Sequence, residues 1–129
     1  MNAFFTQSAV LVFLGGGLGS LARYGIGRLV PALVMAPGFP VAILMVNVVA
    51  SFMLGGVAGF GLARAGTEPL RLLLGVGFCG GLSTFSSFSQ DTLTLLQTGR
   101  IGTALLNIGL NVVLCLLASV SGLWLGQRI

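Results

Sequence analysis

The chain has 129 residues, of which 56% are hydrophobic and only 6% are charged. Soluble domains carry about 25% charged residues, and a water-soluble globule with so few could not cover its surface. Six arginines, one aspartate and one glutamate supply all the charge, and the sequence has no lysine or histidine. The net charge of +4 comes from scattered arginines that form no basic patch. The composition therefore argues against a soluble enzyme, a nucleic-acid binder or a disordered tail.

Four apolar segments follow one another along the chain. They are predicted as helices at about 8–30, 41–63, 70–96 and 101–125. Each is long enough to cross the hydrocarbon core of a bilayer. The first segment lacks the basic stretch that opens a signal peptide, so we expect it to be retained. The sequence thus predicts an all-α membrane protein with four transmembrane helices, built as a single domain over residues 1–129.

Three short connections separate these segments. The first, 31–40, contains three of the four prolines and is predicted to be a loop. Arginines in the connections and near the termini indicate which way the chain is inserted, because they favour the cytoplasmic side of the membrane. One side of the membrane would hold three (Arg64, Arg71 and Arg128) and the other two (Arg28 and Arg100). This near-equal split leaves two alternatives open: insertion both ways round, which permits an antiparallel dimer, or a single orientation that the count does not resolve.

Polar side chains recur inside the predicted membrane spans, where they are energetically costly and often mark a functional site. In the fourth segment they repeat every four residues along one helix face: Thr103, Asn107, Asn111, Cys115 and Ser119. Such a stripe should face protein or water, where it either replaces the hydration shell of a moving ion or only pins helices together. Asn47 in the second segment must likewise find a partner across a helix interface. Arg23 either extends to the membrane interface or attracts an anion into a vestibule.

The third segment has the most unusual composition. Its central string, GVGFCGGLSTFSSFSQD at 75–91, is rich in glycine and hydroxyl residues, and Gly80–Gly81 is interpreted as a helix break. Unwound backbone at that depth exposes carbonyls that hold cations. Phe85 and Phe88 follow on one face and present positive ring edges, although packing alone would also explain them.

Small residues and cysteines complete the pattern. Four small-xxx-small pairs predict close approach of helix backbones: Gly15/Gly19, Gly55/Gly59, Gly77/Gly81 and Gly122/Gly126. Cys79 and Cys115 lie in apolar runs and are interpreted as packing thiols rather than as a disulfide.

Four strings together resemble the Fluc-type fluoride channels, also called the CrcB family. The most specific is GFCGGLSTFSSFS at 77–89. GGGLGSLARY at 15–24, VNVVASFMLG at 46–55 and LLNIGLNVV at 105–113 are similar to the first, second and fourth helices of that family. The resemblance covers nearly the whole chain.

This resemblance implies an antiparallel, dual-topology homodimer in the cell membrane, the inner membrane in a bacterium. Fluoride would leave the cell passively, down its gradient, through two pores at the dimer interface. A central structural sodium ion would be held by the backbone carbonyls of Gly80 and Ser83. The implied anion pathway comprises Arg23 in the vestibule, Asn47 on the second helix, the pair Phe85 and Phe88, and Asn107, Asn111 and Cys115 on the fourth helix.

Three other functions remain as alternatives. A small multidrug transporter also has four short spans, but it needs a carboxylate inside the membrane, and only Asp91 is near. A membrane enzyme would need a nucleophile with a base or a metal cluster, which the sequence lacks, so we predict that the protein is not an enzyme. A purely structural membrane subunit would not need the polar third segment.

Overall fold

The computed structural model describes residues 2–33 and 38–129, so the middle of the predicted loop at 31–40, residues 34–37, lies outside the described residues. Every element within these ranges is helical. In chain order the elements are α1 (Asn2–Leu33), α2 (Val41–Ala63), α3 (Glu68–Leu70), the π-helix η1 (Arg71–Cys79), α4 (Gly80–Leu82), α5 (Phe85–Gln97) and α6 (Ile101–Gly126).

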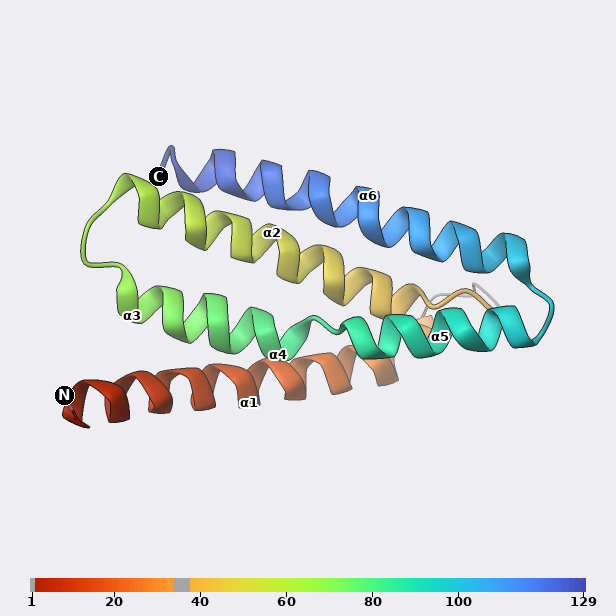
Figure 1. Ribbon diagram of the computed structural model, residues 1–129, viewed down its shortest axis with the longest axis horizontal. Helices are drawn as coiled ribbons and strands as arrows, with labels where there is room; N and C mark the ends of the chain where they lie inside the picture. The colour runs from red at the N-terminus through yellow and green to blue at the C-terminus, as the bar shows by residue number, and fades with distance from the viewer. Residues whose placement is uncertain (1, 34–37) are drawn as a thin grey trace.

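Within the described residues, four helices are long and apolar enough to cross a membrane. They are Phe4–Pro31, Val41–Ala63, Glu68–Gln97 and Ile101–Gly126. The prediction of an all-helical chain with four such helices is therefore confirmed. Figure 1 shows them side by side, in the order α6, α2, the composite third helix and α1, with both termini at the same end.

The third of these helices is wound in several pieces. A π-helix, Arg71–Cys79, passes into one α-helical turn, Gly80–Leu82. Two residues with extended backbone follow, Ser83 (φ −73°, ψ 156°) and Thr84 (φ −154°, ψ 116°). The sequence pattern placed the interruption at Gly80–Gly81, but those two residues are helical. The extended backbone begins three residues later, where side-chain hydrogen bonds replace the helical ones.

Pro31 was predicted to lie in a loop, but α1 continues through it to Leu33. A proline lacks the backbone N–H and removes one hydrogen bond from the helix, to the carbonyl four residues earlier. Here that residue is Gly27, and the missing bond falls in the last two turns. Most of the helix is unaffected, so the ending predicted from the proline alone was wrong.

Glycines set how closely the helices pack, and they divide the molecule into two pairs. Between α1 and the η1–α4 stretch, a Cβ built on Gly15 or Gly19 would overlap carbonyl oxygens of the facing helix, at Leu73 and Phe78. Between α2 and α6, a Cβ on Gly55 would overlap the Ser119 carbonyl in the same way. Backbones approach this closely only where side chains are missing.

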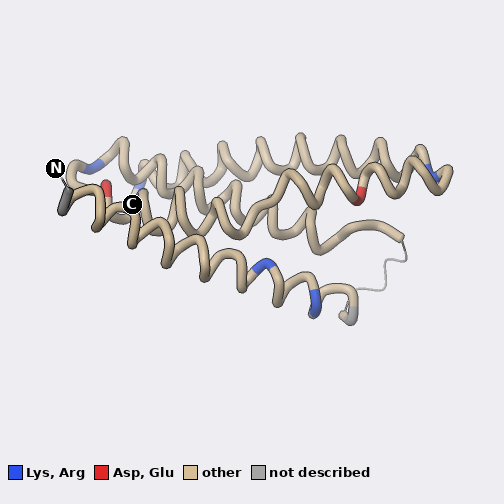
Figure 2. Tube along the Cα trace, turned by 60° about the horizontal axis from the view of Figure 1, so that its bottom comes forward, with Lys and Arg blue, Asp and Glu red and all other residues tan. Residues whose placement is uncertain are grey.

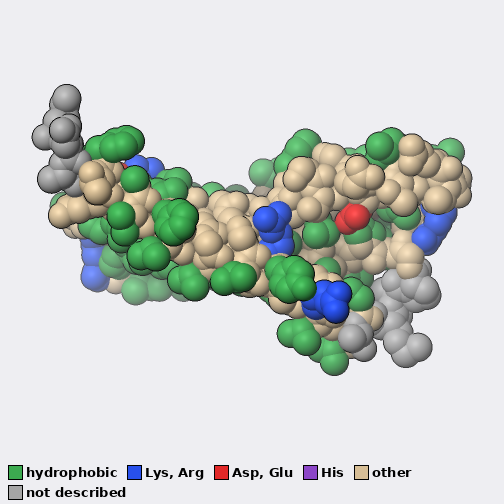
Figure 3. All heavy atoms as spheres, turned by 90° about the horizontal axis from the view of Figure 1, so that it is seen from below, with side chains coloured by type: hydrophobic (Ala, Val, Ile, Leu, Met, Phe, Trp, Pro, Cys, Tyr) green, Lys and Arg blue, Asp and Glu red, His purple; other side chains and the backbone are tan. Residues whose placement is uncertain are grey.

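Charged residues are few and apolar side chains cover much of the surface. Figure 2 shows long stretches of helix without any charged residue. Figure 3 shows hydrophobic side chains over much of one face, with arginines at separate places. At the end with the termini, Arg71 pairs with Glu68 at 2.7 Å, and Arg128 stacks on the Trp124 ring. This distribution suits a molecule whose sides face lipid.

Candidate functional site

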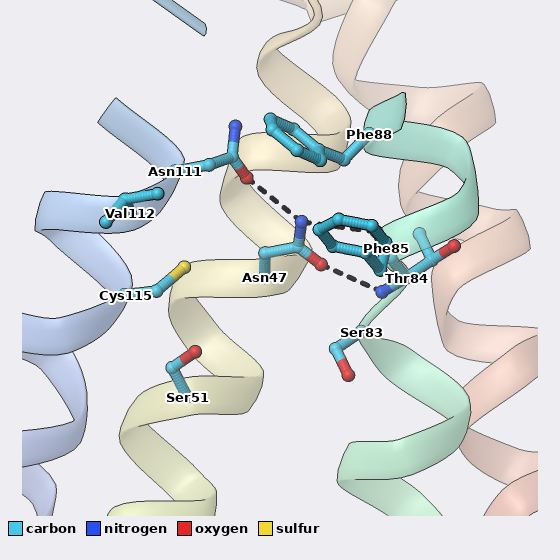
Figure 4. A pocket seen from close by; sticks show the side chains of 9 residues that line it. All are labelled: Asn47, Ser51, Ser83, Thr84, Phe85, Phe88, Asn111, Val112 and Cys115. Carbon is cyan, nitrogen blue, oxygen red and sulfur yellow. Dashed lines mark hydrogen bonds between the residues drawn. The ribbon is translucent and has the colours of Figure 1, made fainter. Parts of the chain in front are cut away.

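Several predicted site residues meet in one pocket of about 280 Å³ between α2, α5 and α6. Figure 4 shows it, and we call it the polar pocket. It is lined by Asn47, Ser51, Ser83, Thr84, Phe85, Phe88, Asn111, Val112 and Cys115. Residues far apart in the sequence come together here because α2 runs along α6 and the extended segment crosses beside them (Figure 1).

Asn47 lies at the centre of this arrangement. Its Oδ1 accepts the backbone N–H of Thr84 at 2.8 Å, and its Nδ2 donates to Oδ1 of Asn111 at 3.0 Å. A second Nδ2 contact, to the Thr84 carbonyl, is longer at 3.4 Å. The predicted need of this amide for partners across helix interfaces is met by both the extended segment and α6, as Figure 4 shows.

The polar stripe of α6 faces the protein. Asn107 is fully buried and Asn111 is 6% exposed, whereas the residues beside them on α6 are largely exposed. Nδ2 of Asn111 donates to both the backbone carbonyl and Oδ1 of Asn107, each at 3.0 Å. Nδ2 of Asn107 donates to Oγ1 of Thr92 at 3.0 Å. Asn107 therefore lies behind the pocket rather than in its wall.

The two phenylalanines lie against each other at the start of α5. Their ring centroids are 5.5 Å apart, with the planes tilted by 48°. Phe85 is 79% exposed, while Phe88 is half-buried. In this tilted arrangement each ring turns part of its positive edge away from its partner. The pair thus adds weakly positive ring edges to a wall that otherwise carries amide and hydroxyl groups.

Thr84 starts α5 and organises the hydroxyl groups around it. Its Oγ1 accepts the backbone N–H of Ser87 at 3.2 Å, which caps the helix. The same oxygen lies 3.1 Å from the hydroxyls of Ser86 and Ser87. Within the described residues, no buried side-chain nitrogen or oxygen lacks a hydrogen-bond partner. The site is thus held in one arrangement by its own polar groups.

A second pocket of about 290 Å³ lies next to the first and shares Ser51 and Ser83 with it. Gly80 also lines this second pocket, and a Cβ built on Gly80 would meet nothing within 4 Å. The two residues predicted to offer carbonyls to a cation thus border one open space. No group of three or more His, Cys, Asp or Glu side chains is found among the described residues, so a cation there would depend on backbone carbonyls and serine hydroxyls.

Two predicted residues lie outside both pockets. Arg23 is half-buried on α1, which packs against η1 and α4. Asn107 is displaced behind Asn111, as described above. Asp91 lines a separate hollow with Arg100, whose Nη1 donates to the Gly38 carbonyl at 2.8 Å.

Ser51 and Thr84 line the polar pocket but were not predicted as site residues. The sequence did contain a signal for Ser51, because this residue follows Asn47 by four positions and so lies on the same helix face. Thr84 stands inside the quoted third-helix string, but its capping role depends on where α5 begins.

Comparison with known proteins bears on the whole chain. Residues 10–123 match the family model described as CrcB-like protein, Camphor Resistance (CrcB). A protein of Pyrococcus horikoshii is 42% identical over 129 residues, covering 99% of this chain and 100% of the relative. Proteins of Vibrio vulnificus and Coxiella burnetii are each 43% identical, covering 96% and 95% of this chain and 97% of each relative.

All three relatives are named "Fluoride-specific ion channel FluC". That name describes an ion channel, in agreement with the prediction of a protein that is not an enzyme. The resemblance drawn from the sequence is confirmed over nearly the full length. With four helices apolar enough to span a bilayer, a site of neutral polar groups and a family match that covers residues 10–123, the chain belongs to the CrcB family of multi-pass membrane proteins.

Proposed function

We propose that this protein is a fluoride-selective ion channel that lets cytoplasmic fluoride leave the cell passively, down its electrochemical gradient. The observation that carries the proposal is the polar pocket, where neutral amide, hydroxyl and thiol groups meet a pair of phenyl rings. The names of the close relatives support fluoride as the ion.

The chemistry of the pocket suits a small anion that holds its water strongly. Removing that water is costly unless donors replace it. Asn47, Ser51 and Cys115 offer neutral donors, and Phe85 and Phe88 offer ring edges. Among the nine lining residues there is no arginine, so no fixed positive charge there would trap the ion. Weak, closely spaced contacts favour passage over tight binding.

A partner subunit is part of the proposal, because the two pockets open on the surface of a single chain. Gly80 and Phe85 are exposed there, beside the polar groups of Ser83 and Thr84. Polar groups exposed to lipid are costly, so this face should be covered by protein or water. An antiparallel copy of the same chain would cover it and would form two pores, each lined by residues of both copies.

The proposed sodium site fits the backbone of the third helix. In a continuous helix the Thr84 N–H would donate to the Gly80 carbonyl, but here it donates to Asn47. Likewise the Ser87 N–H would donate to the Ser83 carbonyl, but it donates to Oγ1 of Thr84. Both carbonyls thus lose their usual donor. Two from each copy would supply four oxygen ligands for one sodium ion at mid-membrane depth.

The cellular location follows from the same proposal. A channel that releases fluoride from the cytoplasm must lie in the membrane that bounds it, which is the inner membrane in a bacterium. The partners in this proposal are a second copy, the fluoride ion and the lipid bilayer, with the structural sodium ion as the cofactor and no nucleic acid.

Ion efflux from liposomes tests the proposal directly. Purified protein is reconstituted into vesicles loaded with fluoride or with chloride, and an ion-selective electrode follows efflux after a potassium ionophore balances the charge. We expect fast fluoride efflux and no chloride efflux. Folded protein that releases no fluoride would refute the channel and would make proton-driven uptake of a cationic drug the next assay.

A further inference from the structure

Five hydrogen bonds connect the extended segment to α5 in one unbroken relay. The backbone N–H of Thr84 donates to Asn47, Asn47 donates to Asn111 and Asn111 donates to Asn107, at 2.8, 3.0 and 3.0 Å. Asn107 then donates to Oγ1 of Thr92 at 3.0 Å, and that hydroxyl donates to the Phe88 carbonyl at 2.8 Å. Every bond points the same way, so each polarises the next.

The two ends of this relay fix its direction. A backbone N–H, here that of Thr84, can only donate, and a backbone carbonyl, here that of Phe88, can only accept. The Thr92 hydroxyl is committed as a donor to Phe88, so its lone pair must accept from Nδ2 of Asn107. This turns Oδ1 of Asn107 toward Asn111.

The direction of the relay determines which asparagine side chain still has an N–H that can donate to an anion. Both Nδ2 contacts of Asn111 return to Asn107, and Asn107 is fully buried. Asn47 also uses one Nδ2 contact in the relay, but its other contact, to the Thr84 carbonyl, is 3.4 Å long. That is the longest bond in the group, so an ion in the polar pocket would displace it most easily.

We propose that Thr92 and Asn107 are positioning residues that hold the α5 end of this relay, so that Asn47, already assigned to the anion pathway, is the one relay amide left with a donor for the passing anion. This inference rests on the proposed channel function. It assigns a role to Thr92, which is 8% exposed and lines neither pocket, and it removes Asn107 and Asn111 from the groups that touch the ion.

The first test removes the Thr92 hydroxyl and measures fluoride efflux from liposomes. Thr92→Val should lower efflux about tenfold or more, because a buried donor on Asn107 loses its acceptor and the relay is no longer held at its α5 end. Thr92→Ser keeps the hydroxyl and should retain efflux. Thr94→Val is the matched control: Thr94 makes the same bond to the carbonyl four residues earlier on α5, at 3.0 Å, but is outside the relay.

A second variant separates relay loss from misfolding. In the double variant Thr92→Val with Asn107→Leu both partners become apolar, which removes the unpaired Asn107 donor. Asn111 loses one acceptor, Oδ1 of Asn107, but keeps the backbone carbonyl of residue 107, so the fold should be retained. We expect an unchanged elution volume and low efflux. Wild-type efflux from Thr92→Val or from the folded double variant would overturn the proposal.

A spectroscopic measurement distinguishes positioning from contact with the ion. The chain has four asparagines, so NMR of protein with nitrogen-15 in asparagine side chains should give four amide pairs. Fluoride, and not chloride, should shift the Asn47 pair most. A larger shift of the Asn107 or Asn111 pair would refute the assignment.

The same spectra keep this inference separate from the channel proposal. In the absence of fluoride, Thr92→Val should shift the amide pairs of Asn107, Asn111 and Asn47, whereas Thr94→Val should not. If wild-type protein released no fluoride but these shifts were seen, the channel proposal would fail while the relay stood. If Thr92→Val left the Asn47 pair unmoved, the relay itself would be refuted.

Discussion

At the scale of single residues, Asn47 joins three parts of the chain that are far apart in the sequence. It lies on α2, accepts from Thr84 in the extended segment and donates to Asn111 on α6. Leaving an amide unpaired in an apolar environment costs about 1–3 kcal/mol by mutational measures. The hydrogen bonds of Asn47 therefore hold the pocket wall in place.

Phe85 provides a direct test of the pocket wall. Replacing it with isoleucine keeps an apolar side chain but removes the positive ring edge and the contact with Phe88. We expect Phe85→Ile to lower fluoride efflux about tenfold, which corresponds to losing about 1.4 kcal/mol. Efflux from liposomes, with gel filtration of the purified protein alongside, measures the change.

Phe13 offers a control with equal exposure. It lies on α1 and is 79% exposed, as Phe85 is, but it lines neither of the two pockets. Phe13→Ile should leave fluoride efflux unchanged. Equal losses from both substitutions, or no loss from Phe85→Ile, would contradict the role given to the phenyl pair.

Some of these residues can be predicted from the sequence, and others cannot, for a physical reason. The four-residue spacing along 101–125 put Asn107, Asn111 and Cys115 on one helix face, and the structure turns that face inward. The partner of Asn107 is Thr92, on another helix. Such a pairing depends on how two helices pack, and periodicity within one helix cannot supply it.

At the scale of elements, the third helix combines regular winding with one interruption. Glycine and hydroxyl residues at 75–91 predicted a break, but not its place. Gly80 and Gly81 have low helix propensity yet remain helical, and Gly81 packs against α1, where a Cβ would overlap the Gly16 carbonyl. The extended backbone forms at Ser83 and Thr84, where an amide from α2 takes over a helical hydrogen bond. That contact comes from another element, so the local sequence could not locate it.

The displaced hydrogen bonds lead to a prediction about sodium. If the carbonyls of Gly80 and Ser83 bind the ion in the assembled protein, sodium should stabilise the folded dimer, by about 2.7 kcal/mol at one hundred times its dissociation constant. Protein purified and reconstituted with N-methylglucamine instead of sodium should melt at a lower temperature and release fluoride more slowly. Lithium and potassium serve as controls for ionic strength. Identical melting curves with and without sodium would contradict the site.

The glycine run at 15–17 gives a prediction about helix packing. A Cβ on Gly15 would overlap the Leu73 carbonyl, whereas one on Gly17 would meet nothing within 4 Å. Gly15→Ala should therefore destabilise the protein by about 1–3 kcal/mol through overpacking. Gly17→Ala should be neutral or slightly stabilising, since alanine favours the helix. Thermal unfolding in detergent compares them, and equal melting temperatures would show that α1 does not pack as described.

At the scale of the whole molecule, two glycine-packed helix pairs leave the polar pocket and the second pocket open on the surface of one chain. The small-xxx-small spacing predicted close helix contacts but not which helices pair. The structure pairs α1 with η1 and α4, and α2 with α6. Pairing is a property of the complete arrangement, because each glycine pair would accept any smooth helix face.

The orientation of the whole chain in the membrane also belongs to this scale, and the near-equal arginine count left it open. Added arginines should bias insertion, because they favour the cytoplasmic side. One chain would carry Ala65→Arg and Gln127→Arg, at exposed positions near the termini. Another would carry Gln97→Arg and Gly102→Arg, at exposed positions at the opposite end.

If the working unit is antiparallel, each biased chain expressed alone should insert one way round and fail to protect cells from fluoride. Co-expression of the two should restore resistance, since one copy of each orientation then forms the dimer. Immunoblots of membrane fractions check that each chain is present at the wild-type level. Full resistance from either chain alone would mean that a single orientation suffices, and the polar pockets would then have to be covered by a parallel partner.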